Sequence, residues 1–286
     1  MAALTSRKSV ADYAVHETKT IVSRDHSDHT FSGIMFSIVV KEELPVDFLE
    51  IEAVAVRGQL GPLTVWVKAG GWELGQHERR SSWKQVYCEE HMPSRRKLVP
   101  LKFDEPARVR GGDKISIYIH SALPNDQAIV YDNQRFYVTR EDDFMRVTPG
   151  LAHLCNEPFG SWHPWGSWRR NREFVGSVSY GVRYILWNPV KQVHQRFNDP
   201  FKDLVLLMLL CKPRADCPFS WLSEDCIFYI LNMTRYDWVK DSGRGNIIGA
   251  NQFITLSSAR RVSTTLFNAA TRGCRAARSL LNYVTI

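Results

Sequence analysis

Acidic residues are missing from the last part of the chain. After Asp241 the sequence contains no Asp or Glu, whereas six arginines follow it: Arg244, Arg260, Arg261, Arg272, Arg275 and Arg278. Because the chain of 286 residues has a formal net charge of +7, these arginines account for almost all of the excess. A basic tail is therefore indicated and not a basic domain, which argues against nucleic acid as the partner.

Long apolar runs are also missing. The longest extends only from Leu204 to Cys211, whereas a helix that spans a bilayer needs roughly 20 apolar residues. The first residues, MAALTSRKSVADYAVHETK, contain no apolar stretch of the kind that directs export. We therefore expect no transmembrane segment, a cytoplasmic or nuclear location, and reduced cysteines.

Metal-binding and catalytic motifs are absent as well. The sequence has no C-x-x-C pair, no glycine-rich phosphate loop, no G-x-S-x-G and no H-E-x-x-H. Asp25-His26-Ser27-Asp28-His29 offers metal-binding groups, but on a polar segment it is typical of a solvated loop. We expect no metal and no cofactor. A nucleophilic cysteine paired with His153 or His163 stays an open alternative, although the prediction is a protein that is not an enzyme.

Three further cysteines, Cys211, Cys217 and Cys226, lack the paired spacing that zinc prefers. Cys211 and Cys226 belong to apolar helical stripes. We therefore expect buried structural thiols at these positions.

Alternating segments fill the chain from residue 31 to about residue 184. Leu63, Val65 and Val67 are separated by Thr64 and Trp66, and segments 115–119 and 174–184 have the same period of two. Such alternation predicts strands with one face in a core. Further strands are predicted at 33–40, 49–56, 83–87, 98–103 and 136–139. With turn residues and no helices between them, the predicted fold class is mainly β, an antiparallel, jelly-roll-like β-sandwich followed by a small α-helical C-terminal segment.

The apolar period changes to that of a helix at Asn198. Phe201, Leu204, Val205, Met208 and Leu209 form one face of a helix that ends before Lys212-Pro213. A second helix is predicted after Ser223, with Glu224 and Asp225 near the positive end of its dipole. The predicted organisation is a flexible lead-in (1–30), a sandwich recognition domain (31–190), a helical docking segment (198–240) and a linker with a basic tail (241–286).

An unusual stretch of tryptophans and arginines lies between two predicted strands. Its members are Trp162, Trp165, Trp168, Arg169, Arg170 and Arg172. A loop of stacked aromatic rings and guanidinium groups suits a sugar ring, a base, or an acidic or phosphorylated peptide. The alternative is a structural connection whose rings cover one end of the core. The two interpretations are compatible, because a rigid aromatic loop can present a binding edge.

The segment 221–231 resembles the opening of an F-box. That opening usually runs Leu-Pro, two acidic or polar residues, two aliphatic residues, two variable positions and Ile-Leu. The matching positions are Leu222, Glu224, Asp225, Ile227, Ile230 and Leu231. Ser223 replaces the usual Pro, Cys226 replaces an aliphatic residue, and the later F-box signature is not recognisable after Trp238.

The resemblance implies docking to a cullin-type ubiquitin ligase, with contacts from Leu222, Ile227, Ile230 and Leu231. The alternative is an ordinary capped amphipathic helix that packs on the sandwich. If the four side chains point away from the sandwich, docking is favoured. If they are buried, the Trp-rich loop is the only candidate site.

A second resemblance concerns the sandwich. The segments HTFSGIMFSI (29–38) and LTVWV (63–67) are similar to the start of PHR-type and related galactose-binding-like sandwiches, which recognise proteins or sugars. In those families the sandwich is often coupled to ubiquitin-ligase modules. The resemblance implies the same coupling here, and it supplies no matched ligand residues.

Two main functional hypotheses follow. The first is an adaptor whose sandwich selects a protein partner and whose helices dock on a larger assembly. The second is a carbohydrate-binding module in which Trp162, Trp165 and Trp168 stack on sugar rings. A hydrolase without a recognisable motif is the third. The tail is either an amphipathic helix for an anionic surface or acidic partner, or a disordered solubilising end.

Overall fold

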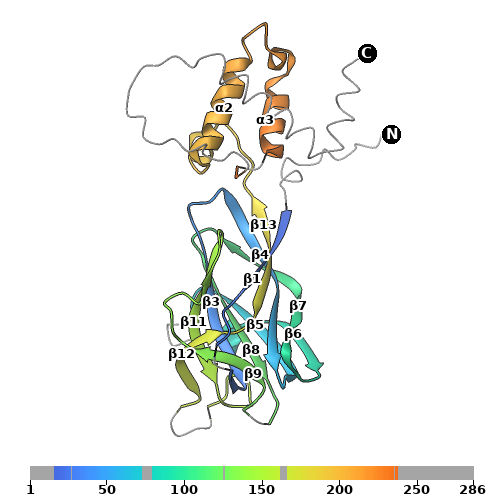
Figure 1. Cartoon of the computed structure of the whole chain (residues 1–286), viewed down its shortest axis with the longest axis vertical. Helices are drawn as coiled ribbons and strands as arrows, with labels where there is room; N and C mark the ends of the chain where they lie inside the picture. Colours follow the sequence, from blue (N-terminus) through green and yellow to red (C-terminus); the bar gives the residue numbers. More distant parts are fainter. Residues whose placement is uncertain are drawn as a thin grey trace, which may run out of the picture. The chain divides into compact units, whose positions relative to one another are not determined.

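Two antiparallel sheets form the main body of the chain (Figure 1). The computed structural model describes residues 16–26, 28–72, 79–124, 126–161, 166–234 and 236–237. The smaller sheet has the order β1 (His16–Val22), β13 (Ser177–Tyr184), β4 (Val46–Gly58) and β7 (Ser94–Arg110). The larger sheet has the order β2 (His29–Phe31), β9 (Ile129–Asn133), β12 (Trp168–Phe174), β11 (Met145–His153), β3 (Gly33–Val40), β8 (Lys114–Ser121), β5 (Gly61–Ala69) and β6 (Lys84–His91), with β10 (Arg140–Glu141) paired to β11. The predicted antiparallel β-sandwich is confirmed.

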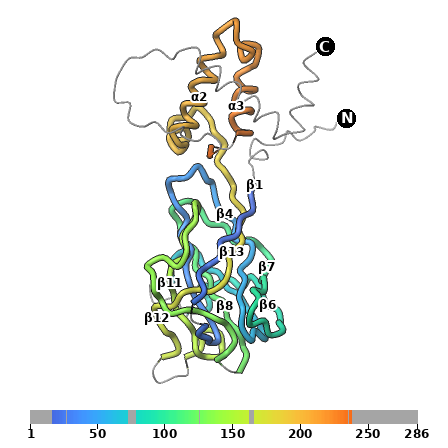
Figure 2. Tube along the Cα trace, in the orientation of Figure 1, coloured from blue at the N-terminus to red at the C-terminus, as the bar shows by residue number. Residues whose placement is uncertain are grey.

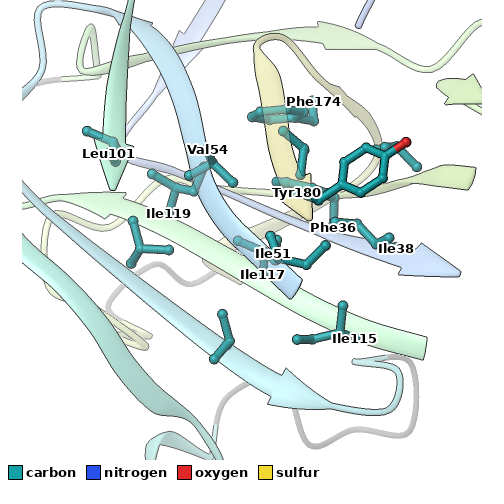
Figure 3. Close-up of a cluster of buried hydrophobic side chains, with 14 of the residues drawn as sticks. Phe36, Ile38, Ile51, Val54, Leu101, Ile115, Ile117, Ile119, Phe174 and Tyr180 are labelled. Carbon is teal, nitrogen blue, oxygen red and sulfur yellow. The ribbon is translucent and has the colours of Figure 1, made fainter. Parts of the chain in front are cut away.

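The main core lies between the two sheets. Figure 3 shows Ile51 and Val54 of β4 and Tyr180 of β13 among side chains of the larger sheet, which include Phe36, Ile117 and Ile119. All of these are buried, and the rings of Phe36 and Phe174 stack with centroids 4.2 Å apart. Full burial of one such side chain contributes about 1.5–3 kcal/mol. The predicted alternation at 63–67 and 115–119 supplies part of this core.

A second cluster of buried side chains covers the other face of the larger sheet. It contains Met35, Trp66, Trp83, Tyr118 and Leu151, with Trp72, Phe159 and Trp168 packed against it. Trp66 and Tyr118 occupy the positions that alternate with the main-core residues on β5 and β8. The expectation that these strands bury one face is therefore wrong. The central strands are buried on both faces, because the connection between β11 and β12 folds over them.

The sandwich begins earlier in the chain than predicted. β1 lies in the segment expected to be a flexible lead-in, and it pairs with β13 along its whole length (Figure 2). Its side chains are mostly polar, with Ile21 its contribution to the core. The Tyr184 hydroxyl donates a hydrogen bond of 2.9 Å to Glu17. An edge strand with one core residue has too little apolar periodicity to stand out in a sequence.

The predicted strand at 136–139 is wrong. These residues form bends between β9 and β10. The side chain of Glu173 accepts hydrogen bonds from the backbone N–H groups of Arg135 (3.0 Å) and Phe136 (2.9 Å). The N–H groups at the start of the segment are therefore satisfied by a buried carboxylate and not by a neighbouring strand.

The helical segment matches the predicted helices. It contains α1 (Lys191–His194), α2 (Asp199–Cys211), the 3-10 turn η3 (Pro218–Trp221) and α3 (Glu224–Met233); a further 3-10 turn, η2 (Arg80–Ser82), precedes β6. The side chains of Asn198 and Ser223 accept hydrogen bonds from the N–H groups of Phe201 and Cys226 and act as the N-caps of α2 and α3. Within the described ranges, no helix has the length and apolar character needed to cross a membrane.

Hydrogen bonds connect the helical segment to the end of the sandwich. The Arg196 guanidinium donates to the carbonyl oxygens of Leu44 (3.0 Å) and Val46 (3.2 Å) beside β4. Asn232 of α3 exchanges two hydrogen bonds with the backbone of Trp187, which follows β13. These contacts fix one side of α3, and they leave its opposite side available to solvent.

Replacement of Gly150 by Ala should destabilise the fold. A Cβ atom at this position would lie 1.7 Å from the carbonyl oxygen of Met35, where β11 pairs with β3 across a register shift. We expect Gly150→Ala to lower the free energy of unfolding by about 3 kcal/mol or more. Urea-induced unfolding followed by Trp fluorescence measures this.

Gly111→Ala is the matched control. The atom nearest to a Cβ added at Gly111 would be the Lys41 carbonyl oxygen, at 3.4 Å. We expect the free energy of unfolding to change by less than about 1 kcal/mol. Equal stability of the two variants would contradict the close packing of β11 on β3.

Candidate functional site

Two buried histidines anchor the loop between β11 and β12. His120 on β8 bonds through Nε2 to the carbonyl oxygen of Cys155 at 2.8 Å. His153 on β11 bonds through Nε2 to the carbonyl oxygen of Gly160 at 3.0 Å, and its Nδ1 lies 2.7 Å from the hydroxyl of Tyr118. Because a carbonyl only accepts, Nε2 of a neutral His153 carries the proton and Nδ1 accepts from Tyr118. These bonds hold the loop over the sheet.

This geometry gives no support to a Cys–His nucleophile. Cys155 is buried and both ring nitrogens of His153 are engaged by other groups. His163 lies outside the described residues.

Among the predicted ligand-binding tryptophans, Trp168 packs within the fold. Its indole ring stacks on the His153 ring with centroids 4.0 Å apart, and it lies 5.4 Å from the ring of Tyr118. Phe159, from the same loop, packs edge-on against Tyr118 at 4.8 Å. Trp162 and Trp165 lie outside the described residues. Trp168 therefore serves the structural role that was the alternative for this loop.

Truncation of Trp168 should weaken the fold. Loss of the stacked ring exposes His153 and Tyr118, so we expect Trp168→Ala to lower the free energy of unfolding by roughly 2–3 kcal/mol. Trp221→Ala is the control, because that side chain is 85% exposed and should contribute little. Chemical denaturation of both variants measures the difference, and a stability loss confined to Trp221→Ala would contradict the packing role.

Burial makes His120 a source of pH-dependent stability. Burial lowers the pKa of His120 to about 3 from an ordinary value near 6.5, against the opposing effect of its bond to the Cys155 carbonyl. Between these two pH values the unfolded chain binds more protons than the folded chain. Stability therefore falls as pH falls through this range, with a slope approaching about 1.4 kcal/mol per pH unit for this one group.

Replacement of His120 should reduce this slope. Between about pH 6 and pH 4, we expect His120→Gln to take up about one proton fewer on unfolding than the unaltered protein. His26→Gln, at an exposed position, is the matched control for the loss of an imidazole. Urea unfolding at several pH values tests both, and an unchanged slope in His120→Gln would contradict a buried neutral imidazole.

The three predicted arginines of this stretch have different surroundings. Arg169 donates to the carbonyl oxygens of Gly166 (3.0 Å) and Trp168 (3.3 Å). Arg172 donates to those of Arg170 (2.8 Å) and Asn171 (3.0 Å). Arg170 is exposed. Arg169 and Arg172 thus help to shape the strand, and Arg170 presents its charge to solvent.

The four predicted docking residues do not share one surface. Ile227 and Leu231 are fully buried, and Leu231 lines a pocket with Tyr184 and Phe197. Leu222 is half-buried, and Ile230 is 37% exposed. The expectation of a common docking face is wrong for Ile227 and Leu231, because their spacing of four residues places both on the inner side of α3.

Large apolar side chains nevertheless stay exposed in the helical segment. Its exposed large side chains, hereafter the helical apolar surface, are Val190, Leu206, Leu210, Trp221, Tyr229, Ile230 and Met233. Leu206 and Leu210 of α2 are 56% and 57% exposed. The sequence prediction did not include them, although they form a second stripe at a spacing of four residues beside the buried one. A helix that is apolar on both sides is the signal that could have identified them.

The cysteines near these helices are less buried than expected. Cys211 and Cys217 are half-buried, and Cys226 on α3 is exposed. The prediction of buried structural thiols is therefore wrong for Cys226, which lies on the solvent side of α3. Burial, followed by the neighbouring Cys217, raises the pKa of the Cys211 thiol.

The carboxylates of the segment 25–29 are engaged by an arginine. The Arg57 guanidinium forms ion pairs with Asp25, at 2.7 Å, and with Asp28. His29 stacks on Tyr131 and bonds to Asn133. Within the part of the chain that the structure describes, no three His, Cys, Asp or Glu side chains are grouped as a metal site would require.

Neither a protein-family model nor a curated protein sequence matches the chain.

Proposed function

We propose that the protein is a non-enzymatic adaptor. In this proposal the sandwich binds a protein partner, and the helical segment docks on a larger assembly of the cullin-type ubiquitin-ligase class. The observation that supports it most is the helical apolar surface. The ligase class rests on the F-box resemblance of residues 221–231.

The distribution of exposed apolar side chains supports docking through the helices. Twelve large hydrophobic side chains are exposed in the described residues, and seven of them lie between Val190 and Met233. The other five are spread over the sandwich, at Val22, Met92, Leu98, Phe136 and Tyr137. Single exposed apolar residues are normal on protein surfaces, whereas a concentration of them is typical of an interaction site.

The construction of α3 also suits a docking element. Ile227 and Leu231 anchor its inner side, and Ser223 caps its first turn. Tyr229, Ile230 and Met233 are thereby held on the outer side at helical spacing. Because the helix is ordered before it meets a partner, binding loses little conformational entropy. Two residues of the F-box-like pattern thus support the helix, and Ile230 is available for contact.

The carbohydrate-binding alternative rests on Trp162 and Trp165. Trp168, the third ring, is engaged with His153. No contact among the described residues favours sugar binding over protein binding.

Introduction of a charge at Ile230 tests the proposal. We expect Ile230→Asp to abolish recovery of ubiquitin-ligase subunits in an affinity pull-down analysed by mass spectrometry, as deletion of residues 218–240 should. The folded sandwich should be retained, with a change in unfolding free energy below about 1 kcal/mol, because Ile230 is partly exposed.

Two further variants serve as controls. Met92→Asp introduces the same charge at an exposed apolar residue of the sandwich, between β6 and β7, and should retain the subunits. Ile227→Asp places a charge in a buried position and should destabilise the protein by several kcal/mol. Full recovery of ligase subunits with folded Ile230→Asp, or none with the unaltered protein, would overturn the proposed docking.

A further inference from the structure

Strands β9 and β12 are neighbours in the larger sheet (Figure 1), and the segments beside them carry exposed arginines and aromatic rings. Arg24 stacks its guanidinium on the ring of Phe136, with 3.9 Å to the ring centroid. Tyr137 is 95% exposed, and Arg135 and Arg170 are also exposed. We call these five residues the arginine–tyrosine surface.

Backbone hydrogen bonds place the start of the 134–137 loop beside β12. Asn133 of β9 pairs with Arg172 of β12. The N–H of Gln134 donates to the carbonyl oxygen of Asn171 at 2.9 Å. Residues 135–137 therefore leave the sheet directly beside the strand that carries Arg170.

Glu173 holds the loop that carries the aromatic rings. Its carboxylate is buried and accepts from the N–H groups of Arg135 and Phe136. The Gln134 side chain donates to the Phe136 carbonyl oxygen at 3.0 Å. A fixed loop presents Phe136 and Tyr137 with little further loss of entropy on binding.

The acidic side chains of Glu173, Asp132, Asp25 and Asp28 are buried or paired with another residue. Glu173 and Asp132 are both buried, and Asp132 accepts from the N–H of His26 at 2.6 Å. Asp25 is paired with Arg57. Within the described residues, no carboxylate forms an ion pair with Arg24 or Arg170. Arg24 and Arg170 therefore present positive charge to solvent at this surface.

We propose that the arginine–tyrosine surface binds an acidic segment of a protein partner. Guanidinium groups match carboxylates through paired hydrogen bonds, and exposed Tyr beside Arg is the composition of energetically important contacts in protein interfaces. The aromatic rings favour a polypeptide with apolar side chains over a purely anionic polymer. The inference deepens the proposed function and rests on it, because it assigns the partner-binding surface of the sandwich.

The test measures binding of a defined peptide to the full-length protein. The probe is a fluorescein-labelled peptide of repeated Glu-Asp-Leu units, and its counterpart carries Gln and Asn in place of the acids. Fluorescence anisotropy gives the dissociation constants at low ionic strength and at about 0.15 M salt. We expect the acidic peptide to bind, the neutral one to bind at least roughly tenfold more weakly, and salt to weaken binding.

Charge reversals locate the surface. The double variant Arg24→Glu with Arg170→Glu should weaken binding of the acidic peptide by roughly tenfold or more. The control reverses Arg96 and Lys97 to Glu, two exposed residues of β7 in the other sheet. It has the same net charge and should bind within about twofold of the unaltered protein. Tyr137→Ala should weaken binding roughly fivefold, and Met92→Ala should not.

Several results would overturn the inference. They are an absence of measurable binding, equal binding of the neutral peptide, equal loss in the two charge-reversal variants, or tighter binding of a heparin fragment. The pull-down of ubiquitin-ligase subunits distinguishes a failure of this inference from a failure of the proposed docking. Arg24→Glu with Arg170→Glu should still recover the subunits, whereas Ile230→Asp should still bind the acidic peptide.

Discussion

Burial of the larger sheet on both faces is the constraint on which the rest of the structure depends. The smaller sheet covers one face of its central strands, and the connection between β11 and β12 covers the other. The backbone groups of that connection are not paired within a strand or helix. It can therefore lie over a sheet only if its carbonyl oxygens find other hydrogen-bond partners. His120 and His153 supply them from the sheet below. Two histidines in an otherwise mainly apolar layer thereby determine the course of the loop.

Buried charged groups are likewise satisfied by backbone groups. Glu173 and Asp132 are buried, and each is satisfied by backbone N–H groups of neighbouring segments. A buried carboxylate is tolerated when such bonds replace its hydration. Each carboxylate orders a neighbouring segment, while Arg24, Arg135 and Arg170 stay at the surface. The positive surface therefore follows from how the β9–β12 region is held together, and the near-neutral composition of the sandwich gives no indication of it.

The helical segment combines an inner and an outer set of apolar residues. On α2, Phe201, Leu204, Val205 and Met208 are buried, whereas Leu206 and Leu210 are exposed. On α3 the division falls between Leu231 and its neighbour Ile230. The inner set joins the helices to each other and to the sandwich end. The outer set stays exposed, and the docking function that we propose would account for its retention at the surface.

The sequence by itself determined the fold class, the two longer helices and most of the core strands. These follow from local rules, since period-two alternation, turn residues and capping side chains act over a few residues. It missed β1 and the bends at 136–139, because an edge strand and a carboxylate-held loop lack an apolar period. Only the tertiary structure decided which face of α3 is buried, that Trp168 stacks on His153, and that Arg24 meets Phe136. Those contacts join residues far apart in the chain, and no local pattern encodes the distance between them.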